Sequence, residues 1–463
     1  MESQDNKVNS TVLLIISVAA SFFNPLMGAA VNIALPKISA EFNMNAIAMS
    51  WIAMAFLLAS AIALVPFGKI ADLYGRKKIF LIGNIVVAIA SLLCAVSSTG
   101  TFLIISRALQ GIGSAMVFGT TMAIVTSAFP PHKRGRIIGI NVTAVYLGLS
   151  IAPLLGGYLT QSIGWRSIFY LMVLVALMTA VLMYIFVKGD WKSPNKENFD
   201  FKGSIIYAFA ITGLIYGFSK LPDINAIIIA LIGVVGLIIF IKTELKLTNP
   251  VMNINLFRDN RTFAYSNLAA MINYAATFAI AFVLSLFLQY VKGFSPRSAG
   301  MILITQPIVM ALFASVSGRL SDRFDPRVLA SIGMSVVVIG LAFLVFLSSG
   351  TSLLYIIISL VIVGIGFGIF SSPNTNAIMS SVENSYLGIA SATVATMRTT
   401  GQMFSMGIAA LIIHTYIGEA KIVQQNLHLF VHSIQIIFIV FTVLCAFGVL
   451  ASLAGRKKNI VNV

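Results

Sequence analysis

Long apolar runs separated by short polar turns make up nearly all of the chain from residue 11 to residue 454. A helix needs about 20 mostly apolar residues to cross the hydrocarbon core of a bilayer. Cutting the sequence at its charged and Pro/Gly-rich breaks leaves fourteen such runs. Their approximate limits are 11–35, 47–67, 79–97, 101–129, 137–161, 167–187, 203–219, 224–241, 262–290, 298–317, 328–348, 351–379, 386–415 and 431–454. The runs are continuous rather than alternating, which excludes a transmembrane barrel.

Composition supports this pattern. Of the 463 residues, 59% are hydrophobic and only 10% are charged, whereas a soluble protein carries about 25% charged residues. We therefore predict an all-α polytopic membrane protein. The first ten residues lack a basic region and a cleavage site, so the first run should be a retained span. Cys94 and Cys445 both lie in apolar runs, which predicts neither a disulfide framework nor a metal or cofactor site.

The net charge of +16 is a topology signal. Lys and Arg are enriched in cytoplasmic loops of membrane proteins. With the N-terminus inside, 22 of the 30 Lys and Arg residues fall on the cytoplasmic side, six fall on the other side, and Arg107 and Arg398 fall within spans. We expect both termini to be cytoplasmic and the protein to reside in the cell membrane. This distribution explains the basic excess better than nucleic-acid binding does.

An internal repeat divides the chain. The second span leads into Gly68-Lys69-Ile70-Ala71-Asp72, and the tenth leads into Gly318-Arg319-Leu320-Ser321-Asp322 at the same end of a span. We predict six-helix bundles over residues 1–190 and 251–463, with residues 191–250 as a linker and an inserted pair of helices. Transporters built from two repeats place their substrate site near the midplane between them. The inserted pair is expected to be peripheral and to carry no site.

Several motifs follow in order along the first half. The loop after the second span contains Gly68, Asp72, Gly75 and Arg76, and the fourth span contains Arg107-Ala108-Leu109-Gln110-Gly111-Ile112-Gly113. The fifth span contains Gly139, Gly148, Pro153, Gly156 and Gly157, and Trp165-Arg166 with Phe169 comes next. The first span ends in Asn32-Ile33-Ala34-Leu35-Pro36. Together these motifs resemble the major facilitator superfamily, specifically its fourteen-span drug/proton antiporters of the QacA/EmrB type.

The resemblance implies roles for the loop and for the fourth span. Asp72 would close the cytoplasmic side against the start of the thirteenth span near Asn384–Leu387. A carboxylate at a helix N-terminus contributes about 0.3 to 2 kcal/mol. Arg107 would face the central cavity and take part in proton coupling, with Gln110 one turn away sharing its hydrogen bonds. The alternative for Arg107 is that it lies near the outer end of its helix and extends to the interface.

The fifth and later spans have their own expectations. Gly148, Ala152 and Gly156 recur along one stripe, which allows close approach to another helix, and Pro153 bends the span. The family is thought to use this seam to bias its gate, although ordinary helix packing predicts the same residues. The sequence SSPNTNAIM, with Pro373 and Asn374, predicts a broken or kinked helix end that lines the cavity. A cavity position for Arg398 competes with purely local hydrogen bonding.

One position departs from the family. The first-span signature opens with an aspartate, and Met27 stands there in this chain. All fourteen acids lie in loops or at span ends. We therefore expect a cavity of polar uncharged and apolar side chains that favours neutral or anionic molecules over dications. The candidates are Asn24, Met27, Asn32, Gln110, Met116, Phe118, Asn141, Tyr146, Asn267, Asn273, Tyr274, Gln306, Asn374, Thr393 and Arg398.

These observations predict a secondary transporter that exports small amphipathic compounds by proton antiport and alternating access, acting as a monomer in the bilayer. The missing acid leaves open an exporter of one metabolite, lipid-like molecule or organic anion without such exchange. No phosphate-binding G-x-x-x-x-G-K-[ST] loop occurs, which argues against ATP use. We do not expect an enzyme, because no span combines a catalytic set of Ser, His, Cys or acid residues. A transporter-like receptor should carry a long signalling tail after the last span, and the chain stops nine residues after residue 454.

Overall fold

The computed structural model describes residues 10–129, 131–191, 199–219, 223–247, 250–252, 254–321, 323–383, 387–418, 420 and 422–454. Within these ranges the regular structure is helical. Thirteen described helices are long and apolar enough to cross a membrane, and they match thirteen of the predicted runs. The run predicted at 386–415 is the 31-residue helix α16 (Leu387–Ile417), which is not among those thirteen.

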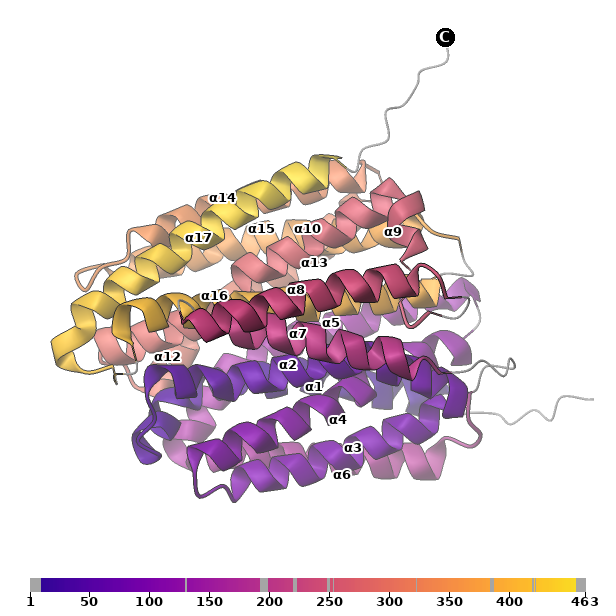
Figure 1. The fold of residues 1–463 in the computed structure, drawn as a ribbon, viewed down its shortest axis with the longest axis horizontal. Coiled ribbons are helices and arrows are strands. Elements are labelled where there is room, and N and C mark those ends of the chain that lie inside the picture. The colour runs from indigo at the N-terminus through magenta and orange to yellow at the C-terminus, as the bar shows by residue number, and fades with distance from the viewer. Residues whose placement is uncertain are drawn as a thin grey trace, which may run out of the picture.

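The first six helices pack together. They are α1 (Ser10–Glu41), α2 (Ala46–Tyr74), α3 (Arg76–Ala95), α4 (Gly100–Ala128), α5 (Pro131–Ser162) and α6 (Arg166–Phe186). α1 packs on α5, α2 on α4, and α3 on both α4 and α6. Figure 1 shows this first helix group in indigo and violet, on the opposite side of the molecule from the helices drawn in orange and yellow.

The later helices repeat the arrangement. They are α9 (Asn255–Asp259), α10 (Arg261–Thr277), α11 (Ile280–Leu286), the π-helical turn η1 (Phe287–Val291), α12 (Pro296–Leu303), α13 (Thr305–Leu320), α14 (Pro326–Val345), α15 (Leu353–Ser380), α16, the short 3₁₀ turn η3 (Gln424–Asn426) and α17 (Leu427–Ala454). α10 packs on α16, α13 on α15, and α14 on both α15 and α17. These pairs correspond in order to those of the first group.

Glycines at matching positions make the repeat visible in atomic detail. A Cβ added at Gly113 of α4 would lie 2.8 Å from the backbone nitrogen of Val87 in α3. A Cβ added at Gly366 of α15 would lie 2.5 Å from the backbone nitrogen of Val337 in α14. Each glycine therefore lets a pair of helix backbones approach more closely than any side chain would allow.

Two predicted elements differ from what is observed. The run 262–290 is three successive helical segments, because the backbone hydrogen bonding changes between Thr277 and Ile280 and again at Phe287. The break or kink predicted at Pro373 is not a break: α15 continues to Ser380 with the proline inside it. The buried amide of Asn374 in the same helix donates to the carbonyl of Ser266, which ties α15 to α10.

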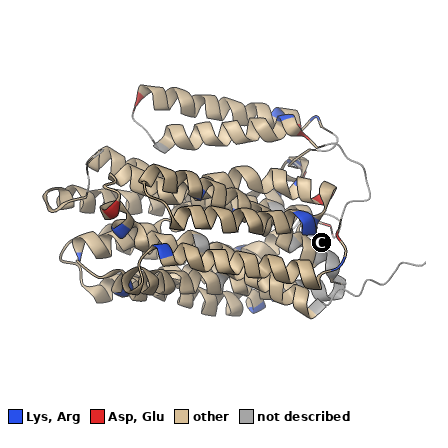
Figure 2. Ribbon diagram, turned by 90° about the horizontal axis from the view of Figure 1, so that it is seen from below, with Lys and Arg blue, Asp and Glu red and all other residues tan. Residues whose placement is uncertain are grey.

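The inserted pair consists of α7 (Phe201–Ser219) and α8 (Ile224–Glu244), which pack on each other. α7 also packs against α2 and α16, and it buries Tyr207, Ile211 and Ile215 there. α8 lies outside α7, and only 17% of an apolar 18-residue stretch of α8 is buried. Figure 2 shows a helix pair standing apart from the remaining helices, and charged residues gathered toward the ends of the bundle.

Candidate functional site

A cavity lies between the two helix groups, with a volume of about 70 Å³. Both groups contribute to it: α1, α2, α4 and α5 from one side, and α16 with Phe278 from the other. Arg398 is the one charged residue among the described side chains that line it. The lining residues are Asn24, Pro25, Gly28, Phe56, Leu57, Ser60, Leu64, Ser114, Ala115, Phe118, Val145, Leu149, Phe278, Arg398, Thr399 and Gln402.

The polar groups of the lining are held in place by neighbouring helices. Asn24 donates to the carbonyl of Ser114 at 3.1 Å, and Ser60 donates to the carbonyl of Gly111 at 3.0 Å. The guanidinium of Arg398 lies 5.1 Å from the ring centre of Tyr274, a cation–π distance. A positive charge is thus fixed beside the cavity while the walls around it remain uncharged.

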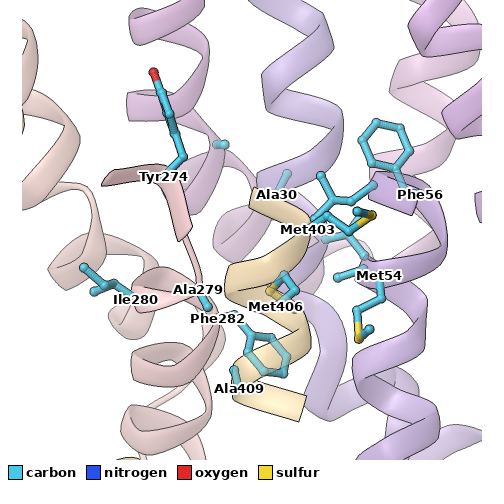
Figure 3. Close-up of a cluster of buried hydrophobic side chains, with 14 of the residues drawn as sticks. Ala30, Met54, Phe56, Tyr274, Ala279, Ile280, Phe282, Met403, Met406 and Ala409 are labelled. Atoms are coloured by element: carbon cyan, nitrogen blue, oxygen red, sulfur yellow. The ribbon is translucent and has the colours of Figure 1, made fainter. Parts of the chain in front are cut away.

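We use two names for the ends of the molecule: the Glu41 end, where α1 ends, and the Asp72 end, where α2 approaches its own end. Toward the Glu41 end the cavity is closed by a methionine cluster, which we define as Met54, Phe56, Phe282, Met403 and Met406. Figure 3 shows Met403 and Met406 of α16 near Met54 of α2, with Phe282 close by. These side chains are 0% to 5% exposed, so the cluster itself is packed closely and excludes solvent.

Backbone contacts continue this closure at the Glu41 end. A Cβ at Gly157 of α5 would lie 2.5 Å from the carbonyl oxygen of Pro296, and one at Gly300 of α12 would lie 2.3 Å from that of Pro153. Gln289 also donates to the carbonyl of Ile33 at 3.1 Å. We call the contact between α5 and α12 the glycine seam.

Other residues of the fifth-span motif serve a different contact. A Cβ at Gly148 would lie 2.1 Å from the carbonyl oxygen of Phe22, and one at Gly156 would lie 2.4 Å from that of Ala30. The predicted close approach to a neighbouring helix is thus confirmed at these two residues, and the neighbour is α1 within the same group. Gly139 lies outside the residues whose side-chain surroundings are described. The motif therefore joins α5 to two partners at once.

Arg107 is fully buried inside the first helix group and is not among the residues that line the cavity. It donates to the carbonyl of Ile52 at 3.1 Å and to the side-chain oxygen of Gln110, and it stacks on Phe56 at 4.4 Å. This confirms the prediction that Gln110, one turn away, shares hydrogen bonds with Arg107. With an exposure of 0%, Arg107 does not extend to an interface. Gln110 in turn donates to Ser91 at 2.6 Å, so a polar network joins α2, α3 and α4.

Around Asp72, the loop motif is held by local pairs. Asp72 accepts from Arg76 at 2.7 Å, and Arg76 also donates to the carbonyl of Ala123. The proposed partners at 384–386 lie outside the described residues, as do the side chains of residues 387 and 388. Gly68 meets no atom within 4 Å of an added Cβ. Gly75 adopts a φ of +116°, which favours glycine.

Trp165 and Arg166 of the W-R-x-x-F motif both bind Glu41. The indole Nε1 donates to Glu41 Oε2 at 2.7 Å, and the guanidinium pairs with Glu41 Oε1 at 2.7 Å. Arg166 also stacks on Trp165 at 4.2 Å and donates to the carbonyl of Ser97. The motif therefore fixes the end of α1 to the start of α6.

The structure divides the predicted cavity residues. Arg398, Asn24 and Phe118 line the cavity. The side chains of Met27 and Tyr146 lie outside the described set. Asn32, Asn141 and Asn273 are buried but are not among the lining residues, and neither are Tyr274 and Asn374. Asn141 instead accepts from Ser21 at 2.9 Å within the first group, and both amide atoms of Asn273 lack a hydrogen-bond partner.

Sequence reasoning missed Ser60, Thr399, Gln402 and Phe278 as lining residues. Gln402 could have been predicted, because Gln402 follows Arg398 by one helical turn and therefore lies on the same face of the helix. Ser60 and Phe278 carried no comparable signal, since single serines and phenylalanines are frequent in these spans.

Comparison with known proteins agrees with the geometry of two repeated helix groups around a cavity. The model of the Major Facilitator Superfamily matches residues 18–265 and 266–460, so the chain belongs to this superfamily of membrane transporters. It is 29% identical over 401 residues to the riboflavin transporter RibZ of Clostridioides difficile, covering 86% of each chain. It is 28% identical over 419 residues to the multidrug resistance protein Stp of Mycobacterium tuberculosis, covering 89% of this chain and 78% of that one.

Solved structures show the same fold. A bacterial homologue of the human lysosomal transporter Spinster superposes with a TM-score of 0.69 at 17% identity, covering 98% of this chain and 100% of that one. The human organic anion transporter MFSD10 superposes with a TM-score of 0.65 at 13% identity, covering 97% and 100%. These likenesses show the fold, and the family match makes the protein a multi-pass membrane transporter that acts on small molecules.

Proposed function

We propose that this protein exports small amphipathic compounds of neutral or anionic character, by alternating access and in exchange for protons. The observation that carries the proposal is the cavity between the two helix groups, whose described lining holds one charged residue, Arg398. A fixed cation surrounded by Phe56, Phe118 and Phe278 suits a molecule with an apolar body and a neutral or negative polar group. It disfavours dications, because like charges repel in an environment of low dielectric constant.

The proposal includes an architecture. Residues 1–190 and 251–463 are the two six-helix bundles, and residues 191–250 carry the inserted pair, as in fourteen-span drug/proton antiporters. The Asp72 end faces the cytoplasm together with both termini, as the distribution of Lys and Arg favours. The protein works as a monomer in the cell membrane. In the state described, the methionine cluster and the glycine seam close the outer side.

Within this mechanism the family motifs act as parts of the gate. Asp72, Gly68, Gly75 and Arg76 form the cytoplasmic latch, and the fifth-span glycines with Pro153 form the seam that must part when the outer side opens. Arg107 and Gln110 support proton coupling by holding α2 and α4, which line the cavity, in register with α3. The names of related proteins, which include two multidrug resistance proteins and a multidrug transporter protein, support an export role.

A second function is favoured by the same arginine. Arg398 would also suit an exporter of one organic anion or metabolite that does not exchange protons, and one relative is named as a transporter of riboflavin. This alternative follows from Met27, which stands where the family has its first-span acid.

Transport in proteoliposomes under an imposed pH gradient tests the proposal. A lipophilic anion and a lipophilic cation of similar size are compared in the wild type and in the variants R398Q and R398K. We expect gradient-driven transport of the anion in the wild type. R398Q should lose about tenfold of this transport, which corresponds to about 1.4 kcal/mol of binding free energy. R398K should recover part of the loss. Anion transport at a rate independent of the pH gradient would favour the second function, export without proton exchange. Equal transport of the cation would contradict the cavity argument.

A further inference from the structure

Two acidic side chains meet at the base of the inserted helix pair, far from the cavity described above. Asp200 directly precedes α7, and its Oδ1 accepts from the backbone N–H of Gly203 at 2.9 Å. Its backbone carbonyl accepts from the amide and the hydroxyl of Ser204. Asp200 therefore caps the first turn of α7 and is held in one orientation.

Glu244 is the last residue of α8 and is 1% exposed. Its Oε2 accepts from the backbone N–H of Met252 at 2.8 Å, which attaches the end of α8 to the segment that leads to α9. Its Oε1 is buried without a hydrogen-bond partner. A buried polar atom left unpaired costs about 1 to 3 kcal/mol, so this oxygen calls for a physical explanation.

The unpaired oxygen of Glu244 lies beside Asp200. A Cβ added at Gly203 would lie 2.1 Å from Asp200 Oδ2 and 2.5 Å from Glu244 Oε1, so both oxygens border the same small space. Asp200 Oδ2 is likewise buried without a partner, so two unpaired carboxylate oxygens border this space. Each therefore offers the other an acceptor, and neither has a donor.

No cation offsets these charges in the described structure. The printed contacts of the Glu244 carboxylate are the backbone N–H of Met252 and, across the space next to Gly203, the carboxylate of Asp200. Among the described lysines, Lys202 on α7 and Lys242 and Lys246 at the end of α8 are nearest in sequence, and they are exposed and form no described ion pair with either acid. On the helices packed against α7, Asp72 of α2 pairs with Arg76, Arg398 of α16 lies over Tyr274, and α2 also carries Lys69.

We propose that Asp200 and Glu244 bind one proton between them, and that this shared proton holds the ends of α7 and α8 to the segment that carries Met252. Two adjacent carboxylates in a buried site cannot both be ionised without a large repulsion. One proton converts the contact into an O–H···O⁻ hydrogen bond, which gives both orphan oxygens a partner. Gly203 is required at this position because any side chain would fill the space between them.

The position of α7 gives the proton a route to act on the transporter. Tyr207, one turn beyond Gly203, lies 3.4 Å from the carbonyl of Ala61 in α2 and within hydrogen-bonding reach of Thr400 in α16. α7 thus touches one helix of each group next to the cavity. Loss of the shared proton separates Asp200 from Glu244. The start of α7, the helix that carries the Tyr207 contact, is then held less firmly. The inference goes beyond the proposed function, since it does not depend on the substrate.

Infrared difference spectroscopy of the purified protein tests the shared proton directly. A protonated carboxylic acid absorbs above the amide I band, whereas a carboxylate does not. We expect the wild type to show a band equivalent to one carboxylic acid at neutral pH, which disappears on titration to alkaline pH. E244Q and D200N should each lose it, because each single variant places a neutral amide donor against the remaining carboxylate. D259N, which changes an exposed acid paired with Arg258, should keep it.

Folding controls are built into this choice. Gln and Asn retain the size of the acids and supply the missing donor, so both variants should unfold at or above the wild-type temperature at alkaline pH. At acidic pH the shared proton already stabilises the wild type, and the difference should vanish. Gly203→Ala should abolish the band by separating the acids, and Gly213→Ala in the same helix should not. A band that persists in both E244Q and D200N, or a wild type without one at neutral pH, would overturn the proposal.

Discussion

The carboxylate of Asp190 occupies the place that a side chain at residue 75 would take. A Cβ built on Gly75 would lie 2.1 Å from Asp190 Oδ2. From there Asp190 Oδ1 accepts from the N–H of Lys77 at 2.8 Å, and Oδ2 accepts from that of Lys78, in the first turn of α3. An acid at a helix N-terminus is favourable because the free N–H groups and the helix dipole attract it. The glycine of the loop motif therefore serves a contact between α3 and the segment that follows α6.

Replacing Gly75 by alanine should destabilise the protein more than the backbone angle alone explains. The φ of +116° costs any L-residue about 1–3 kcal/mol, and the displaced Asp190 should add about 0.3–1 kcal/mol. Gly164→Ala is the matched control, because its φ is +111° and nothing lies within 4 Å of an added Cβ. Thermal unfolding in detergent measures both variants. Identical shifts for the two would contradict the contact, and Asp190→Ala should abolish the excess.

The glycine seam predicts a change of conformation. Gly157→Ala and Gly300→Ala each push α5 and α12 apart, because the added methyl would lie within 2.5 Å of a carbonyl oxygen. A cysteine introduced at the buried position Met54 should then react faster with a membrane-impermeant thiol reagent, by about tenfold or more. The native cysteines do not interfere, since both are buried.

The control for this experiment is Gly407→Ala, whose added methyl would contact only Phe218 at 3.5 Å. It should leave the labelling rate unchanged. Gly148→Ala should differ again: it clashes with α1 inside one helix group and should lower the yield of folded protein rather than raise labelling. Unchanged labelling in both seam variants would show that α5 and α12 are not what closes the outer side.

Arg107 should prove to be a structural requirement as well as a transport residue. Arg107→Ala leaves the buried side-chain oxygen of Gln110 without its donor, and a buried unpaired group costs about 1–3 kcal/mol. The carbonyl of Ile52 loses only its second donor, because it lies inside helix α2 and keeps its helical hydrogen bond. Arg107→Lys should recover part of the loss because it keeps a donor. Ser91→Ala, which removes the partner of Gln110 Nε2, should lower the unfolding temperature less. A variant R107A with wild-type stability and no transport would place the role of Arg107 in coupling alone.

Two variants of Glu41 measure separately the ion pair and the hydrogen bond that join Glu41 to the start of α6. Glu41→Gln removes the ion pair with Arg166, whose side chains are 36% and 41% exposed, so it should cost only about 0–1 kcal/mol. The amide oxygen still accepts from Trp165. Glu41→Ala removes both bonds and should cost about 0.5–1.5 kcal/mol more. Unfolding temperatures in low and high salt distinguish the two terms, and a large, salt-independent loss in Glu41→Gln would contradict this division.

Sequence patterns predicted the helices well, because span length and apolar composition are local properties of the chain. The helices α2, α6 and α14 begin and end within a few residues of the runs predicted at 47–67, 167–187 and 328–348, apart from a longer end of α2. The repeat was predicted from one shared loop pattern. Breaks inside spans were harder: the change at Phe278 carries no proline, and Pro373 does not end its helix.

The cavity was predicted less completely. Arg398 and Asn24 were identified because charged and amide side chains are conspicuous in apolar spans. Asn141 and Asn374 look equally conspicuous in the sequence, yet they bind Ser21 and the carbonyl of Ser266 inside their own groups. Which face of a helix a polar residue occupies relative to its neighbours depends on the rotation of that helix, and an all-apolar span carries little information about its own rotation.

From the order of its residues alone, the chain specified a polytopic helical membrane protein of repeated design and placed its basic loops at one end, since hydrophobic length and charge act residue by residue. Tertiary packing alone decided that Arg107 is enclosed while Arg398 lines the cavity, that one glycine motif contacts both α1 and α12, and that Asp200 meets Glu244. These relationships join residues far apart in the chain, and they arise only when helix backbones come within van der Waals distance of each other.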